Sequence, residues 1–98
     1  MATYVTLYKW TDQGVRNYKD TLKRSDDFRG MVEKAGGRIL QMLWTAGEYD
    51  GLSIFEAPDD ETATALMFQA SSLGNVRTTT MRAFTADAVK KIIAKGPS

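Results

Sequence analysis

The sequence predicts a small α+β domain with the element order βαββαβ and a short helix near the C-terminus. Segments in which apolar residues recur at every second position alternate with segments of helical spacing. Glycine, proline or asparagine stands at several of the changes in spacing, where a strand or helix must end. With 98 residues the chain can enclose one hydrophobic core. We therefore expect a single domain over residues 1–98, with 96–98 as a disordered tail.

Four strands account for the segments of alternating spacing. They contain many of the β-branched and aromatic residues that are typical of strands. We predict them over Tyr4–Trp10, Arg38–Thr45, Leu52–Ala57 and Val76–Phe84. Antiparallel pairing of these strands gives a four-stranded sheet with both longer helices on one face, which is the ferredoxin-like arrangement.

The first helical segment begins at Thr11 or Asp12, either of which can cap it, and ends at Gly36-Gly37. Ser25-Asp26-Asp27 in its middle resembles an internal N-cap. We therefore expect either one long helix or a short turn followed by a helix. The positions that recur at helical spacing are Val15, Tyr18, Leu22, Phe28 or Arg29, Val32 and Ala35.

Two turns fit the connection between the second and third strands. Asp50-Gly51 is a two-residue hairpin signal in its own right. Ala46-Gly47-Glu48 would instead make the turn and leave Tyr49-Asp50 at the start of the third strand. In that second case the Asp50 carboxylate shares a face with Leu52 and Ile54 and needs a partner, for which we expect an arginine or a backbone amide.

The second long helix is predicted to begin at Asp59-Asp60-Glu61, because acidic residues cap a helix and favour its first turn. It runs to Leu73 and ends at Gly74-Asn75. Thr85 is expected to cap a short final helix that carries Val89, Ile92 and Ile93 on one side. The core positions predicted on the second long helix are Ala63, Leu66, Met67, Phe68, Ala70 and Leu73.

Both faces of the predicted sheet are apolar. A sheet with helices on one side and water on the other would carry polar residues on its outer face. A second apolar face therefore predicts a two-fold homodimer in which these faces stack, and larger assemblies of dimers are compatible with it. In the first strand Val5 and Leu7 alternate with Tyr4, Tyr8 and Trp10, and in the second Ile39 and Leu43 alternate with Leu40, Met42 and Trp44.

The composition restricts the chemistry. The chain has no cysteine and no histidine, which excludes disulfides and thiolate nucleophiles and argues against zinc and haem sites. We expect no metal and no cofactor. The net charge of +1 argues against nucleic acid as a partner, and no apolar run reaches the ~20 residues that would cross a membrane. The N-terminus shows no secretory signal, so we expect a cytoplasmic protein.

Four stretches of the sequence resemble the GYD domain family, which takes its name from glycine, tyrosine and aspartate. The resemblance covers nearly the whole chain and implies a dimeric α+β barrel. Proteins of that architecture include cofactor-free oxygenases, haem-handling enzymes and stress proteins, so the fold alone assigns none of these activities. The stretches are Tyr8-Lys9-Trp10-Thr11-Asp12-Gln13-Gly14, Gly47-Glu48-Tyr49-Asp50, Glu56-Ala57-Pro58-Asp59-Asp60-Glu61 and Gly74-Asn75-Val76-Arg77-Thr78.

A ligand site is expected in a cavity between the sheet and the helices. Pockets for small molecules are built from aromatic side chains and a few polar ones. Arg77 and Arg82 are an odd number of positions apart on one strand, so at most one of them faces the cavity. The candidate ligand-binding residues are Tyr8, Trp10, Trp44, Tyr49, Asp50, Arg77 and Arg82.

Three functions are compatible with these residues. The first is a homodimer that binds a small apolar or aromatic molecule. The second is a cofactor-independent enzyme, oxygenase-like or isomerase-like, acting on an aromatic or enolisable substrate. In it Asp50 would be the base or Tyr49 the acid, and Arg77 would hold developing charge. The third is a purely structural oligomerisation protein, in which the aromatic residues fill the dimer core and Asp50 is a turn residue.

Overall fold

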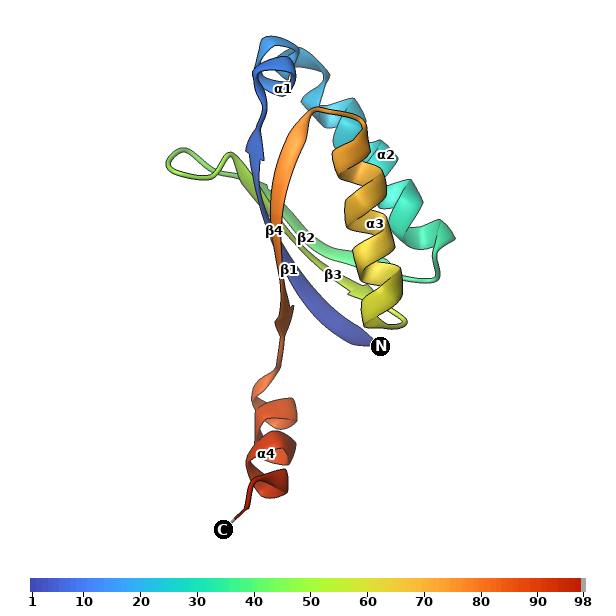
Figure 1. Ribbon diagram of the computed structural model, residues 1–98, viewed down its shortest axis with the longest axis vertical. Helices are drawn as coiled ribbons and strands as arrows, with labels where there is room; N and C mark the ends of the chain where they lie inside the picture. The colour runs from blue at the N-terminus through green and yellow to red at the C-terminus, as the bar shows by residue number, and fades with distance from the viewer. Residues whose placement is uncertain (98) are drawn as a thin grey trace.

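The computed structural model describes residues 1–97 and shows an α+β fold (Figure 1). The order of its elements is that expected from the sequence, with a short extra helix and a 3-10 turn after the first strand. The elements are β1 (Ala2–Trp10), α1 (Asp12–Arg16), η1 (Tyr18–Asp20), α2 (Thr21–Lys34), β2 (Arg38–Trp44), β3 (Gly51–Ala57), α3 (Asp60–Ser72), β4 (Val76–Ala83) and α4 (Ala86–Lys95).

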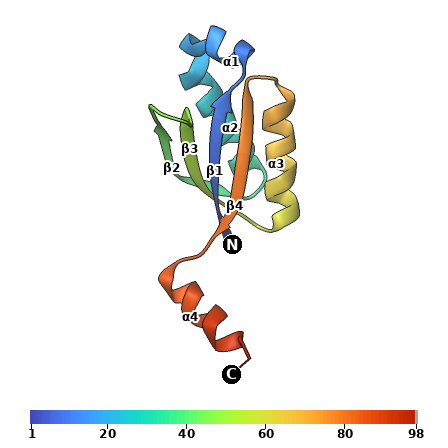
Figure 2. The same ribbon diagram turned by 60° about the vertical axis from the view of Figure 1, so that its left-hand side comes forward.

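The four strands form one sheet in the order β2-β3-β1-β4, and every neighbouring pair is antiparallel. This is the ferredoxin-like order that the sequence predicts. Helices α2 and α3 lie side by side on one face of the sheet, and within residues 1–97 no helix lies on the opposite face (Figures 1 and 2). Within residues 1–97 no helix is both long and apolar enough to cross a membrane.

The core lies between the sheet and these two helices. Phe55 of β3 and Val32 of α2 are completely buried at its centre. The Phe55 ring stacks on Tyr4 with centroids 5.4 Å apart, and Phe28 meets it edge-on at 6.0 Å. The remaining buried apolar residues are Ala57, Ala63, Leu66 and Met67.

The uncovered face of the sheet is apolar at its centre, as the sequence predicts, but carries Lys9, Glu56 and Arg77 toward its ends. Its members share one side because they lie directly opposite one another in the strand register, and they alternate with the buried positions. Nothing in the described chain covers them. They are Val5 and Leu7 of β1, Leu43 of β2, Leu52 and Ile54 of β3, and Met81 of β4, which we call the open face.

A bulge in β2 corrects the expected alternation of that strand. Ile39 lies opposite Phe55, but Gln41 rather than Leu40 lies opposite the next residue, Ile54. The extra residue reverses the sides of the positions that follow. Met42 therefore faces the helices and Leu43 the open face, so Ile39 and Leu43 lie on opposite sides of the sheet.

The first helical segment is broken, and the break lies earlier than Ser25-Asp26-Asp27. Thr11 caps α1 by accepting a hydrogen bond from Gly14 N at 3.1 Å. The chain leaves the helix at Asn17, makes the 3-10 turn η1, and restarts as α2 at Thr21. The Ser25 region lies inside α2, where its side chains help to cover the sheet or face water.

A six-residue loop joins β2 to β3, so neither turn expected from the sequence forms. Thr45 N donates to Asp50 O at 3.0 Å and closes the loop, and Thr45 Oγ1 donates to Tyr49 O at 2.6 Å. Gly51 then pairs with Trp44 as the first residue of β3. Asp50 is the last residue of the loop.

Helix α3 begins as predicted, with Asp59 accepting a hydrogen bond from Thr62 N at 2.8 Å. The expected core positions Phe68 and Leu73 are wrong, because their side chains are 73% and 59% exposed. The remaining expected positions are buried or, for Ala70, half-buried. At the other end of the chain α4 extends away from the sheet (Figure 1), and of the expected tail Ser98 lies outside the described residues.

Candidate functional site

A cavity of about 120 Å³ lies between the sheet and the two long helices, toward the end of the sheet where β1 meets α1. Six elements contribute to its walls, from β1 through β4. Most of the lining is apolar. The lining residues are Thr6, Tyr8, Trp10, Thr21, Arg24, Ser25, Asp27, Phe28, Met31, Met42, Ser53, Met67, Ala70, Leu73, Asn75, Val76 and Thr78.

The cavity exists because small side chains occupy the centre of the covered sheet face. Thr6 and Ser53 lie opposite each other on β1 and β3, where longer apolar residues would fill the space. Thr6 Oγ1 is 2.8 Å from Thr80 Oγ1 and donates to Met67 Sδ at 3.5 Å. Within residues 1–97 no buried side-chain nitrogen or oxygen lacks a hydrogen-bond partner. The cavity therefore offers a ligand mainly apolar contact.

Tyr8 stands at the rim of the cavity, and its phenol stays protonated at neutral pH. Burial raises the pKa of Tyr8, the nearby Asp50 carboxylate raises it further, and the Arg24 guanidinium opposes them. The Tyr8 ring packs across Gly51, and a methyl group there would overlap with the ring. The Tyr8 ring can keep this position only because residue 51 is glycine. A protonated phenol can donate one hydrogen bond to a ligand at the rim.

Arg24 holds the rim on the helix side. Its guanidinium donates to Asn17 O at 2.9 Å and to Gly14 O at 3.2 Å. These bonds tie the break after α1 to the first turn of α2, because Asn17 and Gly14 flank that break. Arg24 therefore fixes the outline of the opening and also supplies a positive charge there.

Asp50 lies beside the cavity and does not line it. Its Oδ2 accepts a hydrogen bond from Trp10 N at 2.8 Å, and its own N donates to Tyr8 O at 2.9 Å. The expectation of a backbone-amide partner is confirmed by this contact. The carboxylate replaces a strand partner for the last residue of β1 and so holds the six-residue loop against Tyr8 and Trp10.

Neither Trp44 nor Tyr49 lines the cavity, although Trp44 lies next to it. Trp44 is 42% exposed, and its Nε1 donates to Thr21 Oγ1 at 2.9 Å, which joins β2 to α2. It lines an open groove of about 520 Å³ between these two elements, which shares Ser25 and Met42 with the cavity. The Tyr49 ring packs under Lys9, whose Nζ is 5.3 Å from the ring centroid and 3.8 Å from Glu48 Oε1.

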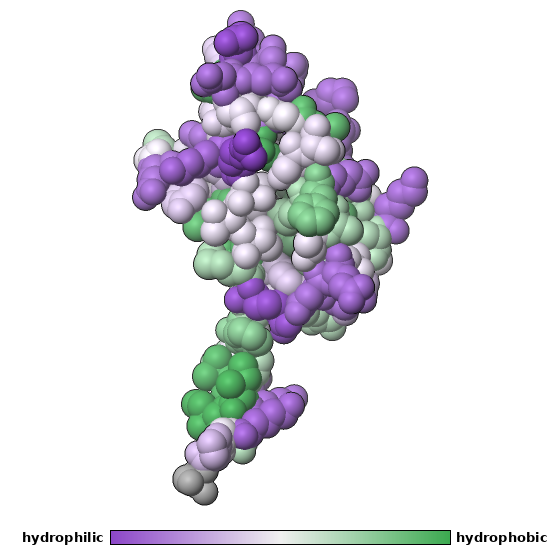
Figure 3. All heavy atoms as spheres, viewed as in Figure 1, coloured by the Kyte–Doolittle hydropathy of each residue, from purple (hydrophilic) through white to green (hydrophobic). Residues whose placement is uncertain are grey.

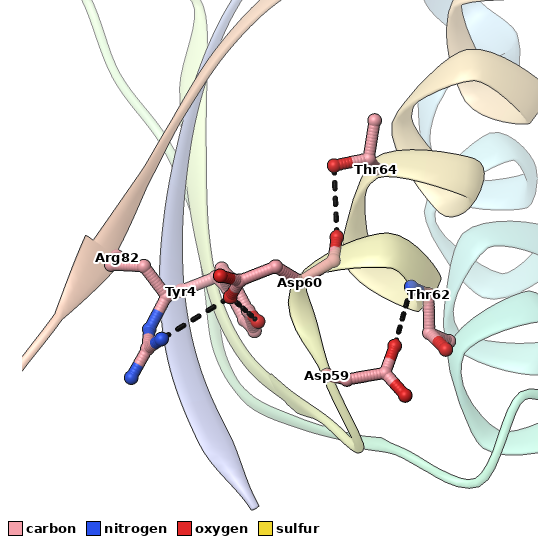
Figure 4. A network of polar contacts seen from close by, with 6 residues as sticks. All are labelled: Tyr4, Asp59, Asp60, Thr62, Thr64 and Arg82. Carbon is pink, nitrogen blue, oxygen red and sulfur yellow. Dashed lines mark hydrogen bonds and ion pairs between the residues drawn. The ribbon is translucent and has the colours of Figure 1, made fainter.

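The two arginines of β4 also lie outside the cavity lining, on opposite sides of the strand. Arg77 is opposite Lys9 in the register and is exposed on the side of the open face. Arg82 lies toward the opposite end of the strand, where its Nη1 donates to Asp60 Oδ1 at 3.2 Å (Figure 4). Tyr4 donates to the same oxygen at 2.5 Å.

This Tyr4–Asp60–Arg82 network stabilises the start of α3 against the sheet. Burial and the Asp60 hydrogen bond raise the pKa of Tyr4 to about 12, and the same bond lowers the pKa of Asp60. The Arg82 guanidinium also lies 5.5 Å from the Tyr4 ring centroid. All of these contacts are made within the chain, so the network fastens an element to the sheet.

The structure thus brings together Tyr8 and Trp10 from the residues expected in the site, and the other five lie elsewhere. The sequence interpretation missed the helix side of the cavity. The sequence did contain a signal for the helix side. Four residues of the lining recur at spacings of three and four and so share one face of α2, namely Thr21, Arg24, Ser25 and Phe28.

Comparison with known proteins agrees with this fold. The GYD domain family matches residues 4–93. A Thermus thermophilus protein named glutamine synthetase and cystathionine beta-lyase binding protein is 28% identical over 94 residues, which are 94% of this chain and 99% of the relative. A crystal structure of a protein from the same organism superposes with a TM-score of 0.56 at 22% identity, covering 88% of this chain and 96% of the other. The chain belongs to the GYD domain family.

Proposed function

We propose that this chain is a homodimeric binding domain that holds a small apolar or aromatic molecule in the cavity beneath α2 and α3. The observation that carries the proposal is the cavity itself, which is apolar and has Tyr8 at its rim. Apolar cavities of roughly 150 Å³ hold one benzene molecule. A cavity of about 120 Å³ therefore suits a ligand of the size of a single aromatic ring.

Binding is favoured over catalysis because the three residues of the catalytic alternative do not converge. Asp50 is committed to Trp10 N, and Arg77 is exposed on the open-face side of β4. Tyr49 packs under Lys9 at the surface. None of the three lines the cavity. A general base must lie within hydrogen-bonding reach of the substrate proton, and Asp50 is held outside the cavity by its bond to the backbone.

The homodimer is supported by the open face. Six large apolar side chains lie on it, and those of Leu43 and Met81 are 47% and 45% exposed in the single chain. Burial of apolar area contributes roughly 25 cal/mol per Å². A second copy with the same face would remove both patches from water in one symmetric contact.

The test is an NMR titration with phenol, which is aromatic, small enough for the cavity and able to hydrogen-bond to Tyr8. We expect saturable shift changes at the backbone amides of the cavity lining. Ala70→Leu should abolish them, since Ala70 lines the cavity and a leucine would fill it. Ala65→Leu is the matched control, because Ala65 is exposed on the same helix.

The titration has a clear contrary result. Shift changes that survive Ala70→Leu, or that never saturate, would assign phenol to the surface and contradict the proposal. Native mass spectrometry of the protein purified from its own host would then show whether any small molecule travels with it. A co-purified molecule that Ala70→Leu displaces and Ala65→Leu retains would support the cavity.

A second candidate function is docking on another enzyme, as the name of the Thermus thermophilus relative suggests for that protein. The observation that favours it is the groove between α2 and β2, where three large apolar side chains are exposed. Leu22 is 66%, Leu40 44% and Trp44 42% exposed, and all three line the groove. Exposed apolar clusters of this kind mark contacts with other proteins.

A binding titration with purified glutamine synthetase from the same host tests this candidate. We expect Leu22→Glu to weaken binding at least about tenfold, because it would place a charge in an apolar contact. Lys19→Glu, one turn earlier and exposed, should change it by less than about threefold. Equal losses for both variants, or no binding by the parent, would remove this candidate.

A further inference from the structure

Helix α4 has one apolar and one polar side, divided along its whole length. Ala86, Val89, Ile92 and Ile93 lie on one side at spacings of three and four residues, and the exposed fractions of the last three are 40%, 46% and 71%. None of the residues of α4 is buried. The opposite side carries Asp87, Lys90, Lys91 and Lys95.

Helix α4 is capped at its N-terminus, but no other element of the described chain covers its apolar side. Thr85 Oγ1 accepts a hydrogen bond from Ala88 N at 3.2 Å and caps it. Both ribbon views show α4 beyond the end of the sheet, joined to β4 by a short extended link (Figures 1 and 2). A ten-residue helix is marginal in water unless an apolar side is packed against something. The helix therefore requires a partner surface.

The apolar side of α4 points the same way as the open face. In Figure 3 the apolar side chains of α4 gather on the left of the helix and the hydrophilic ones on its right. The right is the side on which α2 and α3 lie in the same view (Figure 1). The uncovered surface of the sheet thus continues, past the end of β4, into the uncovered side of α4.

Estimates of the buried area support the packing of α4 on a second copy of the chain. A four-stranded sheet of this length presents roughly 450 Å² on one face, from strands ~4.8 Å apart that rise ~3.3 Å per residue. Two stacked faces bury about 900 Å², which is below the ~1,200 Å² of a stable interface. Two helical arms, each ~15 Å long and ~10 Å wide, raise the total to roughly 1,500 Å² when each covers an equal area.

We infer that α4 is an arm that packs its apolar side onto a second copy of this chain, extending the contact between the open faces. The inference rests on the proposed homodimer and adds the element that makes its contact large enough. It assigns Val89, Ile92 and Ile93 to the partner copy, and it leaves Lys90 and Lys91 in water, where their charge needs no partner.

The first experiment is sedimentation equilibrium of a matched pair of variants. Ile92→Glu and Lys91→Glu introduce the same residue at adjacent positions on opposite sides of α4. We expect Ile92→Glu to weaken the dimer at least about tenfold, because a charge would be desolvated in the contact. Lys91→Glu should change the dimer constant by less than about threefold. Neither position packs on the body of its own chain, so both variants should fold.

The second experiment shows which chain α4 touches. The chain has no cysteine, so Val89→Cys gives a single attachment point for a photoreactive maleimide. The labelled protein is mixed with ¹⁵N-labelled parent, irradiated, and analysed by mass spectrometry. We expect cross-links between ¹⁴N and ¹⁵N peptides. Cross-links confined to peptides of one isotope in a mixed dimer would overturn the inference.

The outcomes separate this inference from the proposed function. A parent dimer that is unchanged by Ile92→Glu overturns the arm and leaves the homodimer standing. A monomeric parent overturns both, while the phenol titration still decides the cavity. Binding of the parent to vesicles of anionic phospholipid, lost in Ile92→Glu with the dimer unchanged, would assign α4 to a membrane surface and overturn the arm.

Discussion

The two faces of the sheet differ in the size of their central side chains and in whether helices cover them. At the centre of the two middle strands the covered face carries Thr6 and Ser53, whereas the open face carries valine, leucine and isoleucine. Toward the strand ends the open face carries Thr3, Lys9 and Glu56. The face that the chain buries itself therefore has the smaller side chains at its centre. Its small side chains leave the cavity, and its aromatic residues supply the core. The aliphatic centre of the open face stays uncovered within the described residues.

Burial within one chain and aliphatic character at the centre are thus separate properties of a sheet face. Helices α2 and α3 cover the side that their connections allow, because the two βαβ units turn in the same sense and place both helices together. We expect the uncovered face to contact another molecule. We expect variants on the two faces to differ in kind, since one face determines folding and the other association.

The largest effect is expected on the covered face, for Phe55→Ala. Phe55 is completely buried between Tyr4 and Phe28, so its removal leaves a cavity in the core. The free energy of unfolding should fall by ~3–5 kcal/mol. Leu52→Ala, on the open face of the same strand, should lower that of the single chain by less than ~1.5 kcal/mol. Urea denaturation, at a protein concentration that favours the monomer, measures the free energy of unfolding of both variants. Equal losses would contradict the difference expected between the two faces.

An intermediate effect is expected at the loop that holds the rim of the cavity. Asp50→Ala removes the acceptor of Trp10 N and should lower the free energy of unfolding by ~1–3 kcal/mol. Asp50→Asn keeps an oxygen acceptor, so its loss should be smaller. Chemical denaturation of the two variants separates the acceptor from the charge. If both matched the parent, the Asp50 contact would have no role in stability, and Asp50 would be only a surface turn residue.

A smaller and pH-dependent effect is expected from Tyr4, on the covered face. Its pKa is raised to about 12 in the folded chain, above the ordinary value near 10. The folded chain thus keeps a proton that the unfolded chain loses, so stability is full below pH ~10 and falls as the pH rises toward 12. Tyr4→Phe should remove this part of the alkaline decline. Denaturation at pH 9 and pH 11 tests it, and parallel declines in parent and variant would contradict the assignment.

The helices, the strands and the existence of an uncovered sheet face could be predicted from the sequence, because they follow from local periodicity and from capping residues. Thr11, Asp59 and Thr85 each begin a helix as predicted. Positions that depend on contacts between elements were less accessible. The bulge at Leu40 reversed the end of β2, and Phe68 lies on an exposed part of α3 although its neighbour Met67 is buried.

The candidate site was predicted on its sheet side and missed on its helix side. Tyr8 and Trp10 follow from alternation within a single strand, which fixes their side once Tyr4 is in the core. Arg77 and Arg82 lie on the same sheet but outside the cavity lining, and only the register with β1 gives their position along it. The break at Asn17 could not be placed either, since it depends on Arg24 reaching back across the turn.

We propose that the open face is an interface between two copies of the chain, and sedimentation equilibrium measures this association. At micromolar concentration the parent should sediment with twice the 10.9 kDa mass of one chain. Leu43→Lys, which places a charge on that face, should shift the protein to the single-chain mass while its far-ultraviolet circular dichroism stays that of the parent. A parent that sediments at 10.9 kDa, or a dimer unaffected by Leu43→Lys, would contradict the claim.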